Sequence, residues 1–264
     1  MAAMDLALHA QNALAVLSGS FVGFSLALIG GGGSILAVPL LLYVVGVKSP
    51  HLAIGTSALS VAVNAFANLV PHSRAGNVRW GQAVVFAAAG VIGALLGSTA
   101  GKLVDGQRLL SLFALLMLVV AFLMVRPKRP AAGPVCEGRV CLIRLALIGC
   151  AAGLLAGFFG IGGGFLIVPG LILATGMDIL HAIGTSLVSV GSFGLATALN
   201  YAASGLVEWR IALLFIGGGV AGGWIGAAVA QRLARRRAAL NWVFAAAIVA
   251  VAVFMLAKNA GAAA

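Results

Sequence analysis

Acidic side chains are nearly absent from this sequence. Only five Asp and Glu residues occur among 264, and charged residues of both signs together make up 8% of the chain. A soluble domain carries about 25% charged residues, so this chain lacks the side chains that would keep a folded surface in water. With 62% hydrophobic residues and a mean hydropathy of +1.17, the composition predicts an integral membrane protein.

Other absences narrow the class further. The three cysteines do not form a paired set and have no zinc-binding neighbours. The run GGGGS lacks the GK[ST] ending of a nucleotide-binding loop, so energy has to come from gradients or a partner, and we expect no cofactor and no metal. The alternating pattern of membrane β-barrels is also missing, which predicts an all-α polytopic protein. The net charge of +11 is explained by basic loops rather than by nucleic-acid binding.

Apolar segments alternate with short polar connections along the whole chain. We place these segments at residues 12–29, 34–46, 53–70, 81–101, 109–125, 142–159, 164–176, 182–203, 211–230 and 239–257. We interpret the first of them as a retained membrane segment, because no basic region precedes it. The sequence therefore predicts an N-terminal membrane repeat (1–125), a basic linker (126–141) and a C-terminal membrane repeat (142–264).

The two halves of the sequence repeat one another. Pro39 recurs as Pro169, 130 residues later, and the Gly-Thr-Ser triplet at 55–57 recurs 129 residues later at 184–186. We therefore predict two repeats of about five helical segments each, 8–10 in total. If the first two segments of each half run antiparallel, each half has odd parity, and the repeats are inverted in the membrane.

The basic residues support this topology. With inverted repeats, the arginine-containing loops 72–79, 126–144 and 231–237 all fall on one side of the membrane. By the positive-inside rule that side is cytoplasmic. We therefore predict a multi-pass protein of the cell inner membrane, with a cytoplasmic linker and both termini outside the cytoplasm.

A short segment follows a glycine cluster in each half. Segments 34–46 and 164–176 have 13 residues each, about 20 Å as helix, which is less than the roughly 30 Å hydrocarbon core. The sequence leaves open whether they cross the membrane or are re-entrant. Paired short, glycine-interrupted segments in corresponding positions of two halves indicate the binding site of a transporter.

The residue types around these breaks favour an anion. A broken helix leaves backbone N–H groups free at the start of the next helix, where anions bind; the alternative is close helix packing through small residues. The hydroxyls after Gly55 and Gly184 either cap a helix or bind anion oxygens, and the two roles are compatible. The predicted substrate-binding residues are Gly30, Gly31, Gly32, Gly33, Thr56, Ser57, Asn64, Gly160, Gly162, Gly163, Gly164, Thr185 and Ser186.

Further polar residues allow two interpretations each. Asn64, Asn68 and Asn200 lie in apolar segments, where they either join helices or contact substrate. His51 and His181 either relay protons near neutral pH or sit at the interface as capping residues. No Asp or Glu falls within an apolar segment, which argues against a buried carboxylate relay or cation site and again favours an anion.

Three duplicated motifs carry a resemblance to a known family. They read GGGGSILAVP with GIGGGFLIVP, PHLAIGTSA with LHAIGTSLV, and AGNVRW with SGLVEW. In their order, spacing and duplication the chain resembles the sulfite exporter TauE/SafE family of bacterial membrane transporters, over nearly its whole length. The resemblance implies transport, commonly export, of small sulfur oxyanions or organosulfonates such as sulfite or sulfoacetate. The first copy departs by one extra residue between His51 and Gly55.

The leading hypothesis is therefore a secondary transporter of a small anion that works by alternating access between inverted repeats. Its partners are the anionic substrate and the lipid bilayer, and the sequence leaves open whether it forms a homo-oligomer. An intramembrane hydrolase using Ser57 with His51, or Ser186 with His181, is the alternative enzyme hypothesis. A passive channel or assembly protein is the third.

Overall fold

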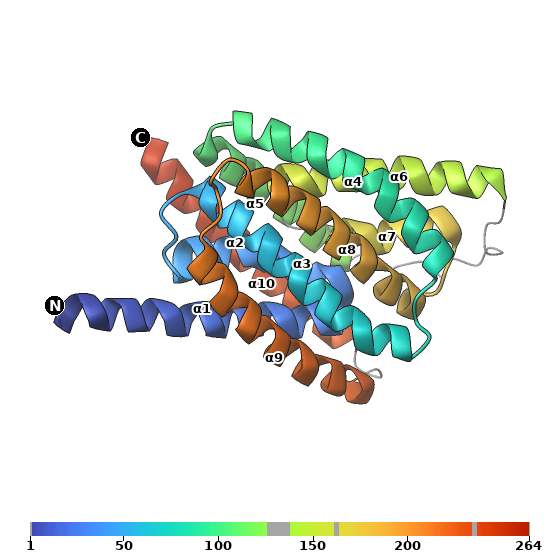
Figure 1. Ribbon diagram of the computed structural model, residues 1–264, viewed down its shortest axis with the longest axis horizontal. Helices are drawn as coiled ribbons and strands as arrows, with labels where there is room; N and C mark the ends of the chain where they lie inside the picture. The colour runs from blue at the N-terminus through green and yellow to red at the C-terminus, as the bar shows by residue number, and fades with distance from the viewer. Residues whose placement is uncertain (1, 126–137, 161–163, 234–236, 264) are drawn as a thin grey trace.

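Every regular secondary-structure element in the described part of the chain is a helix, as the sequence predicts. The computed structural model describes residues 2–125, 138–160, 164–233 and 237–263, with side chains over 8–27, 33–122, 138–160, 166–226 and 245–258. Its elements are α1 (Ala2–Ile29), the 3-10 helix η1 (Gly30–Leu36), α2 (Ala37–Pro39), the π-helix η2 (Leu40–Val44), α3 (Pro50–Arg74), α4 (Trp80–Leu103), α5 (Gly106–Val125), α6 (Arg139–Phe159), α7 (Gly164–Thr175), α8 (Ile179–Ala202), α9 (Trp209–Leu233) and α10 (Arg237–Ala263) (Figure 1).

The exterior of the helix bundle is apolar and its interior contains many polar groups. Six helices among the described residues are long and apolar enough to span a membrane: those in α1, α3, α4, α6, α8 and α9. Large apolar side chains such as Leu17, Ile92 and Leu213 are more than 60% exposed. By contrast, several hydroxyl and amide side chains of α3 and α8, such as Thr56, Asn64 and Ser186, are fully buried. Exposed apolar patches of this extent are expected of a protein whose solvent is lipid.

Each short segment runs back along the helix that precedes it. At one end of the first pair, the Gln11 amide of α1 donates to Val45 O at 3.1 Å. At the matching point of the second pair, Cys141 Sγ of α6 lies 3.7 Å from Ala174 O at the end of α7. The antiparallel arrangement that the parity argument assumed is therefore present in both halves.

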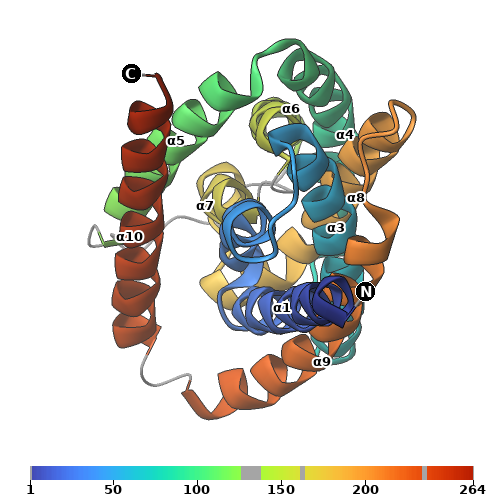
Figure 2. The same cartoon turned by 90° about the vertical axis from the view of Figure 1, so that its left-hand side faces the viewer.

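The described helices of the two halves are interleaved. Helix α1 packs against α9 and α4 against α6, while α3 packs against α8 and α5 against α10. By the predicted register, α1 corresponds to α6, α3 to α8, and α4 to α9. Figure 2 shows the consequence: α7 and the light-blue segment after α1 lie in the middle, surrounded by the longer helices, with α5 and α10 forming one side.

Glycines permit the close approach of the interleaved helices. A β-carbon added to Gly23 of α1 would lie 1.9 Å from Gly219 O of α9, and one on Gly153 of α6 would lie 2.0 Å from Gly90 O of α4. These are corresponding pairs with the halves exchanged. A two-fold relation between the halves produces reciprocal contacts of this kind. The corresponding helices α3 and α8 also run antiparallel to each other. Both observations are consistent with inverted repeats.

The loops fall into two groups at opposite ends of the molecule. At the end we call the first end, Arg210 donates to Asn12 Oδ1 at 2.7 Å, and Gly106 lies against Pro50. At the second end, Asn77 lies against Gly184 near the start of α8. The N- and C-termini share the first end, on the left in Figure 1.

Candidate functional site

The two predicted breaks lie inside the molecule, and the short segments that follow them pack against each other. Gly33 packs against Ser25 of α1, 14 residues beyond Gln11 and so about 21 Å from the first end. Helix α7 begins at Gly164, 10 residues before Ala174 and about 15 Å from the second end. Because η1 packs against α7 and α8, the two short segments meet inside the bundle. The end of α6 at Gly160 lies nearer the first end, against Ile54 in the first turns of α3.

The second break is held against the first half of the chain. Gly160 ends α6 with φ +67°, a left-handed conformation suited to glycine. A β-carbon there would lie 2.1 Å from Ile54 Cγ2 of α3, and Ser57 Oγ lies 3.0 Å from Gly160 O and 2.9 Å from Ile54 O. Gly162 and Gly163 lie outside the described residues.

The Gly-Thr-Ser triplets form reciprocal contacts between the halves. Thr56 Oγ1 accepts a hydrogen bond from the backbone N–H of Glu208 at 2.9 Å; we call this the Thr56 contact. Thr185 Oγ1 accepts from the N–H of Arg79 at 3.0 Å, which is the Thr185 contact. Each threonine thereby binds the backbone just before α9 or α4 of the other half, and each hydroxyl keeps its own proton for a further acceptor.

The glycine of each triplet lets the opposite loop approach. A β-carbon on Gly55 would lie 2.1 Å from Leu206 O, and one on Gly184 would lie 2.4 Å from Asn77 O. Sequence reasoning nominated the hydroxyls after these glycines but missed the loop backbone that they contact. The duplicated AGNVRW and SGLVEW motifs were the available signal, because each one supplies the loop for the other half's triplet.

The three intramembrane asparagines differ in their partners. Asn200 joins helices: its Nδ2 donates to Ser98 Oγ at 2.6 Å and lies 3.0 Å from Thr99 Oγ1, and its Oδ1 accepts from Lys102 Nζ at 2.8 Å. Asn64 and Asn68 are 0% and 1% exposed. Neither carboxamide has a hydrogen-bond partner among the described residues.

The two histidines do not occupy corresponding positions. Ser49 caps α3 by accepting from Leu52 N, whereas Asp178 caps α8, so His181 lies one position further into its helix than His51. His181 bonds through Nδ1 to the Asp178 carboxylate. Burial alone would raise the pKa of Asp178, but the hydrogen bonds from His181 and from the backbone N–H of Leu180 lower it below its usual value.

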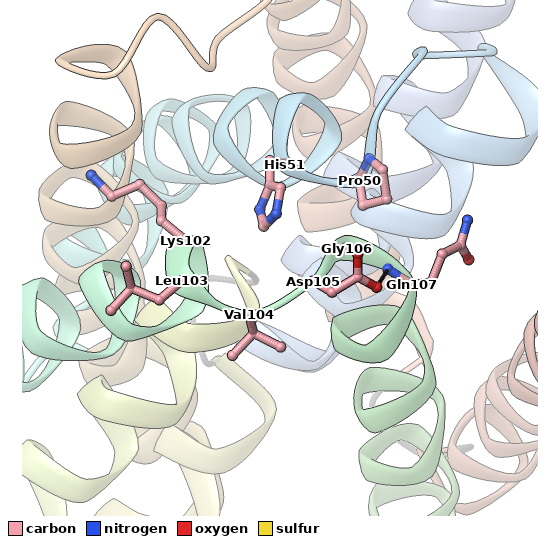
Figure 3. A pocket seen from close by; sticks show the side chains of 8 residues that line it. All are labelled: Pro50, His51, Lys102, Leu103, Val104, Asp105, Gly106 and Gln107. Carbon is pink, nitrogen blue, oxygen red and sulfur yellow. Dashed lines mark hydrogen bonds between the residues drawn. The ribbon is translucent and has the colours of Figure 1, made fainter.

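His51 lies at the first end, in a pocket of about 530 Å³. The other lining residues are Pro50 and residues 102–107, at the junction of α3, α4 and α5. Figure 3 shows the His51 ring directed toward this junction, whereas the Lys102 ammonium points away from it, where it bonds to Asn200 and Ser204. The end of α6 comes close to this pocket, because Gly160 lies against Ile54, three residues after His51, and Phe158 O lies against Gly101.

A serine–histidine pair is not formed by the residues that the hydrolase hypothesis requires. Ser57 Oγ lies against two backbone carbonyls, as described above, and Ser186 Oγ donates to Ile183 O at 2.7 Å. His51 instead lies beside Tyr201, with ring centroids 6.5 Å apart. The hydroxyls therefore join segments of backbone, and the geometry offers no activated nucleophile at these positions.

Comparison with known proteins gives a consistent result. The sequence model of the family described as "Sulfite exporter TauE/SafE" matches residues 15–255. A "Probable membrane transporter protein" from Xylella fastidiosa strain Temecula1 is 54% identical over 243 residues, covering 90% of this chain and 92% of its own. The "Probable membrane transporter protein YunE" of Bacillus subtilis strain 168 is 27% identical, covering 83% of this chain and 88% of its own. No solved structure matches the chain.

Proposed function

Because the chain belongs to the sulfite exporter TauE/SafE family of membrane transporters, we propose that it is a secondary transporter, working as an exporter, of a small anion. A sulfur oxyanion or organosulfonate such as sulfite or sulfoacetate is the proposed substrate. Transport takes place across the cell inner membrane by alternating access between the two repeats. In this proposal the first end, with both termini, faces away from the cytoplasm and the basic linker faces it.

The observation that carries this proposal is the meeting of the two glycine-interrupted short segments inside the bundle. Helix segments that begin inside a membrane direct backbone N–H groups and the positive ends of their dipoles into the interior. Two such starts from opposite directions make an environment suited to a small oxyanion. The proposed substrate-binding residues are the glycines of both breaks, 30–33 and 160–164, with the hydroxyl pairs 56–57 and 185–186 and with Asn64.

The distribution of charge also favours an anion. None of the six candidate spans contains an Asp or Glu, so no carboxylate in them opposes a negative substrate. Donors that are neutral amides and hydroxyls hold an anion less firmly than arginine does. Moderate binding suits a carrier, because the substrate has to leave again on the other side.

The reciprocal contacts suggest how access alternates. The Thr56 contact lies near the first end and the Thr185 contact near the second. Each joins one half to the other, so a rocking motion of the halves that opens one end breaks the contact there and keeps the other. Both hydrogen bonds are present in the structure, and in the proposed cycle a state that keeps both of them is occluded at both ends.

Counterflow in proteoliposomes tests the function directly. Proteoliposomes that contain the purified protein are loaded with unlabelled anion. The uptake of labelled sulfite, sulfoacetate, thiosulfate and sulfate into them is then followed at two pH values. We expect saturable exchange of at least one of these anions, absent from protein-free vesicles. Flux that never saturates would indicate a channel. Exchange of cations or neutral solutes, with none of the four anions, would contradict the proposal.

A further inference from the structure

Two carboxamides buried in α3 have no hydrogen-bond partner among the described residues. Asn64 and Asn68 lie four residues apart on one face of α3, and both the Nδ2 and the Oδ1 of each side chain lack a partner among the described residues. A buried polar group left unpaired costs about 1–3 kcal/mol. Four such atoms in neighbouring side chains therefore need an explanation other than packing.

The helix α9 places a glycine opposite each of the two asparagines. A β-carbon on Gly219 of α9 would lie 2.0 Å from Asn64 Nδ2, and one on Gly223 would lie 2.5 Å from Asn68 Oδ1. The two glycines are four residues apart, as the asparagines are, so they form a matching bare strip on α9. Any side chain on this strip would collide with the carboxamides.

Joining helices does not account for this pair. Asn200 shows what an asparagine with that role does here, since its amide and carbonyl both have partners on α4. The corresponding positions of the second half also show that the fold needs no carboxamide. There Phe193 rests on Gly90 and stacks with Phe86 at 6.2 Å.

We propose that Asn64 and Asn68 form an oxyanion-binding pair on the transport pathway, and that this pathway follows the α3–α9 interface and not the corresponding α8–α4 interface. The two Nδ2 groups supply four N–H donors, which suits the several oxygens of a sulfur oxyanion. This inference rests on the proposed function and adds Asn68 and the side of the molecule to it.

The location of the pair connects binding to the motion of the halves. Helix α3 belongs to the first half and α9 to the second, so the amides are uncovered only when the halves move apart at this interface. The Thr56 contact ties the start of α9 to the same helix α3. Opening the first end breaks that contact and admits the anion to the two amides.

The test compares variants of both interfaces in the counterflow assay, using whichever of the four anions the unsubstituted protein exchanges fastest. In N64D and N68D the shape is kept, but a carboxylate oxygen replaces the donating amide. We expect each to lower kcat/KM about tenfold or more, the effect of losing one hydrogen bond to a charged group. The matched control is T197V, at the position corresponding to Asn68, which should stay within about twofold because it removes a comparably buried hydroxyl from the other interface.

Gel filtration and melting temperature establish that each variant is folded. N64L serves as the second variant: it removes the unpaired amide, should fold at least as well, and should lose exchange to the same extent. Unchanged exchange in N64D and N68D, or in N64L where an aspartate variant does not fold, overturns the proposal. So does sodium-stimulated exchange gained by N64D, which would identify a cation site at the carboxamide oxygens. If the unsubstituted protein exchanges none of the four anions, the proposed function itself has failed.

Discussion

The α3–α9 and α8–α4 interfaces share a framework and differ at their centres. In each interface a threonine accepts a hydrogen bond from a backbone N–H of the other half. In each, a glycine of α9 or α4 also faces the partner helix, α3 or α8. At the centre of one interface Asn64, which has no hydrogen-bond partner in the described part of the chain, lies on Gly219. At the corresponding point of the other, Phe193 fills the space over Gly90.

This difference separates structural from functional constraint within one molecule. Features present at both interfaces serve the fold, because both interfaces have to pack. The carboxamides occur at one interface only and are destabilising where they lie, so packing does not explain them. A duplicated protein thus contains an internal reference, since each half shows what the other would be without its specific chemistry.

The largest loss of stability should come from replacing the glycine that each interface has at the corresponding position. Gly55→Ala and Gly184→Ala place a methyl group 2.1 Å and 2.4 Å from a backbone carbonyl oxygen, and overpacking of this kind costs about 3 kcal/mol or more. We expect both variants to lose most folded protein, measured as the monodisperse fraction in detergent. Equal losses at both positions would support the shared framework.

Gly217→Ala is the matched control for these variants. It lies in α9, and a β-carbon there meets nothing within 4 Å. Replacing a helical glycine by alanine in open space stabilises by up to about 1 kcal/mol. If Gly217→Ala were as damaging as Gly55→Ala, the loss would come from glycine flexibility rather than from the approach of the opposite loop.

The next effect distinguishes the two centres. Phe193→Ala leaves a cavity between α8 and α4 and should lower the free energy of unfolding by about 3 kcal/mol. Asn64→Leu removes polar atoms that have no partner, so we expect no loss of stability and a small gain. Unfolding midpoints in detergent measure both. A large destabilisation by Asn64→Leu would mean that the amide is paired in the folded protein.

The two threonine contacts should be equivalent and smaller. Thr56→Val and Thr185→Val each leave a backbone N–H without its acceptor, at a cost of about 1–2 kcal/mol. Thr56→Ser and Thr185→Ser keep the hydroxyl and should retain most of the stability that the valine variants lose. A strongly unequal pair of values, measured by thermal unfolding, would show that one end of the molecule is closed more firmly than the other.

The helical class followed from the sequence, whereas the antiparallel course of the short segments was an assumption of the parity argument that the structure supports. Spacing and hydropathy are local properties, and the duplication supplied the long-range alignment. The partners of Thr56 and Thr185 did not follow, because residues 152 and 106 positions apart meet only through the interleaving of the halves. Alignment by spacing also paired His51 with His181, although capping by Ser49 and Asp178 sets the two helices one residue out of that register.

The binding residues proposed here remain predictions, and the sequence nominated only part of the asparagine pair. Asn64 was nominated, and Asn68 was noted only as a polar residue needing a partner. The face that they share follows from their spacing of four, but the glycine strip opposite them lies on a helix of the other half. Which asparagine joins helices and which lacks a partner depends on atoms such as Lys102 Nζ, whose reach across to Asn200 no sequence pattern encodes.

The smallest effect concerns the two helix caps, of which only one titrates. Ser49→Ala and Asp178→Ala should each cost about 1 kcal/mol at neutral pH, since each removes an N-cap. The pKa of Asp178 is lowered in the folded protein, so its charge stabilises the fold above the unfolded value of about 4 and ceases to do so as the pH falls through the lower folded value. The cost of Asp178→Ala should therefore shrink in unfolding measurements near pH 3, while that of Ser49→Ala stays constant. If the cost of both substitutions stayed constant with pH, the carboxylate charge would contribute nothing at this exposed cap. Ser49 and Asp178 would then stabilise their helices in the same way.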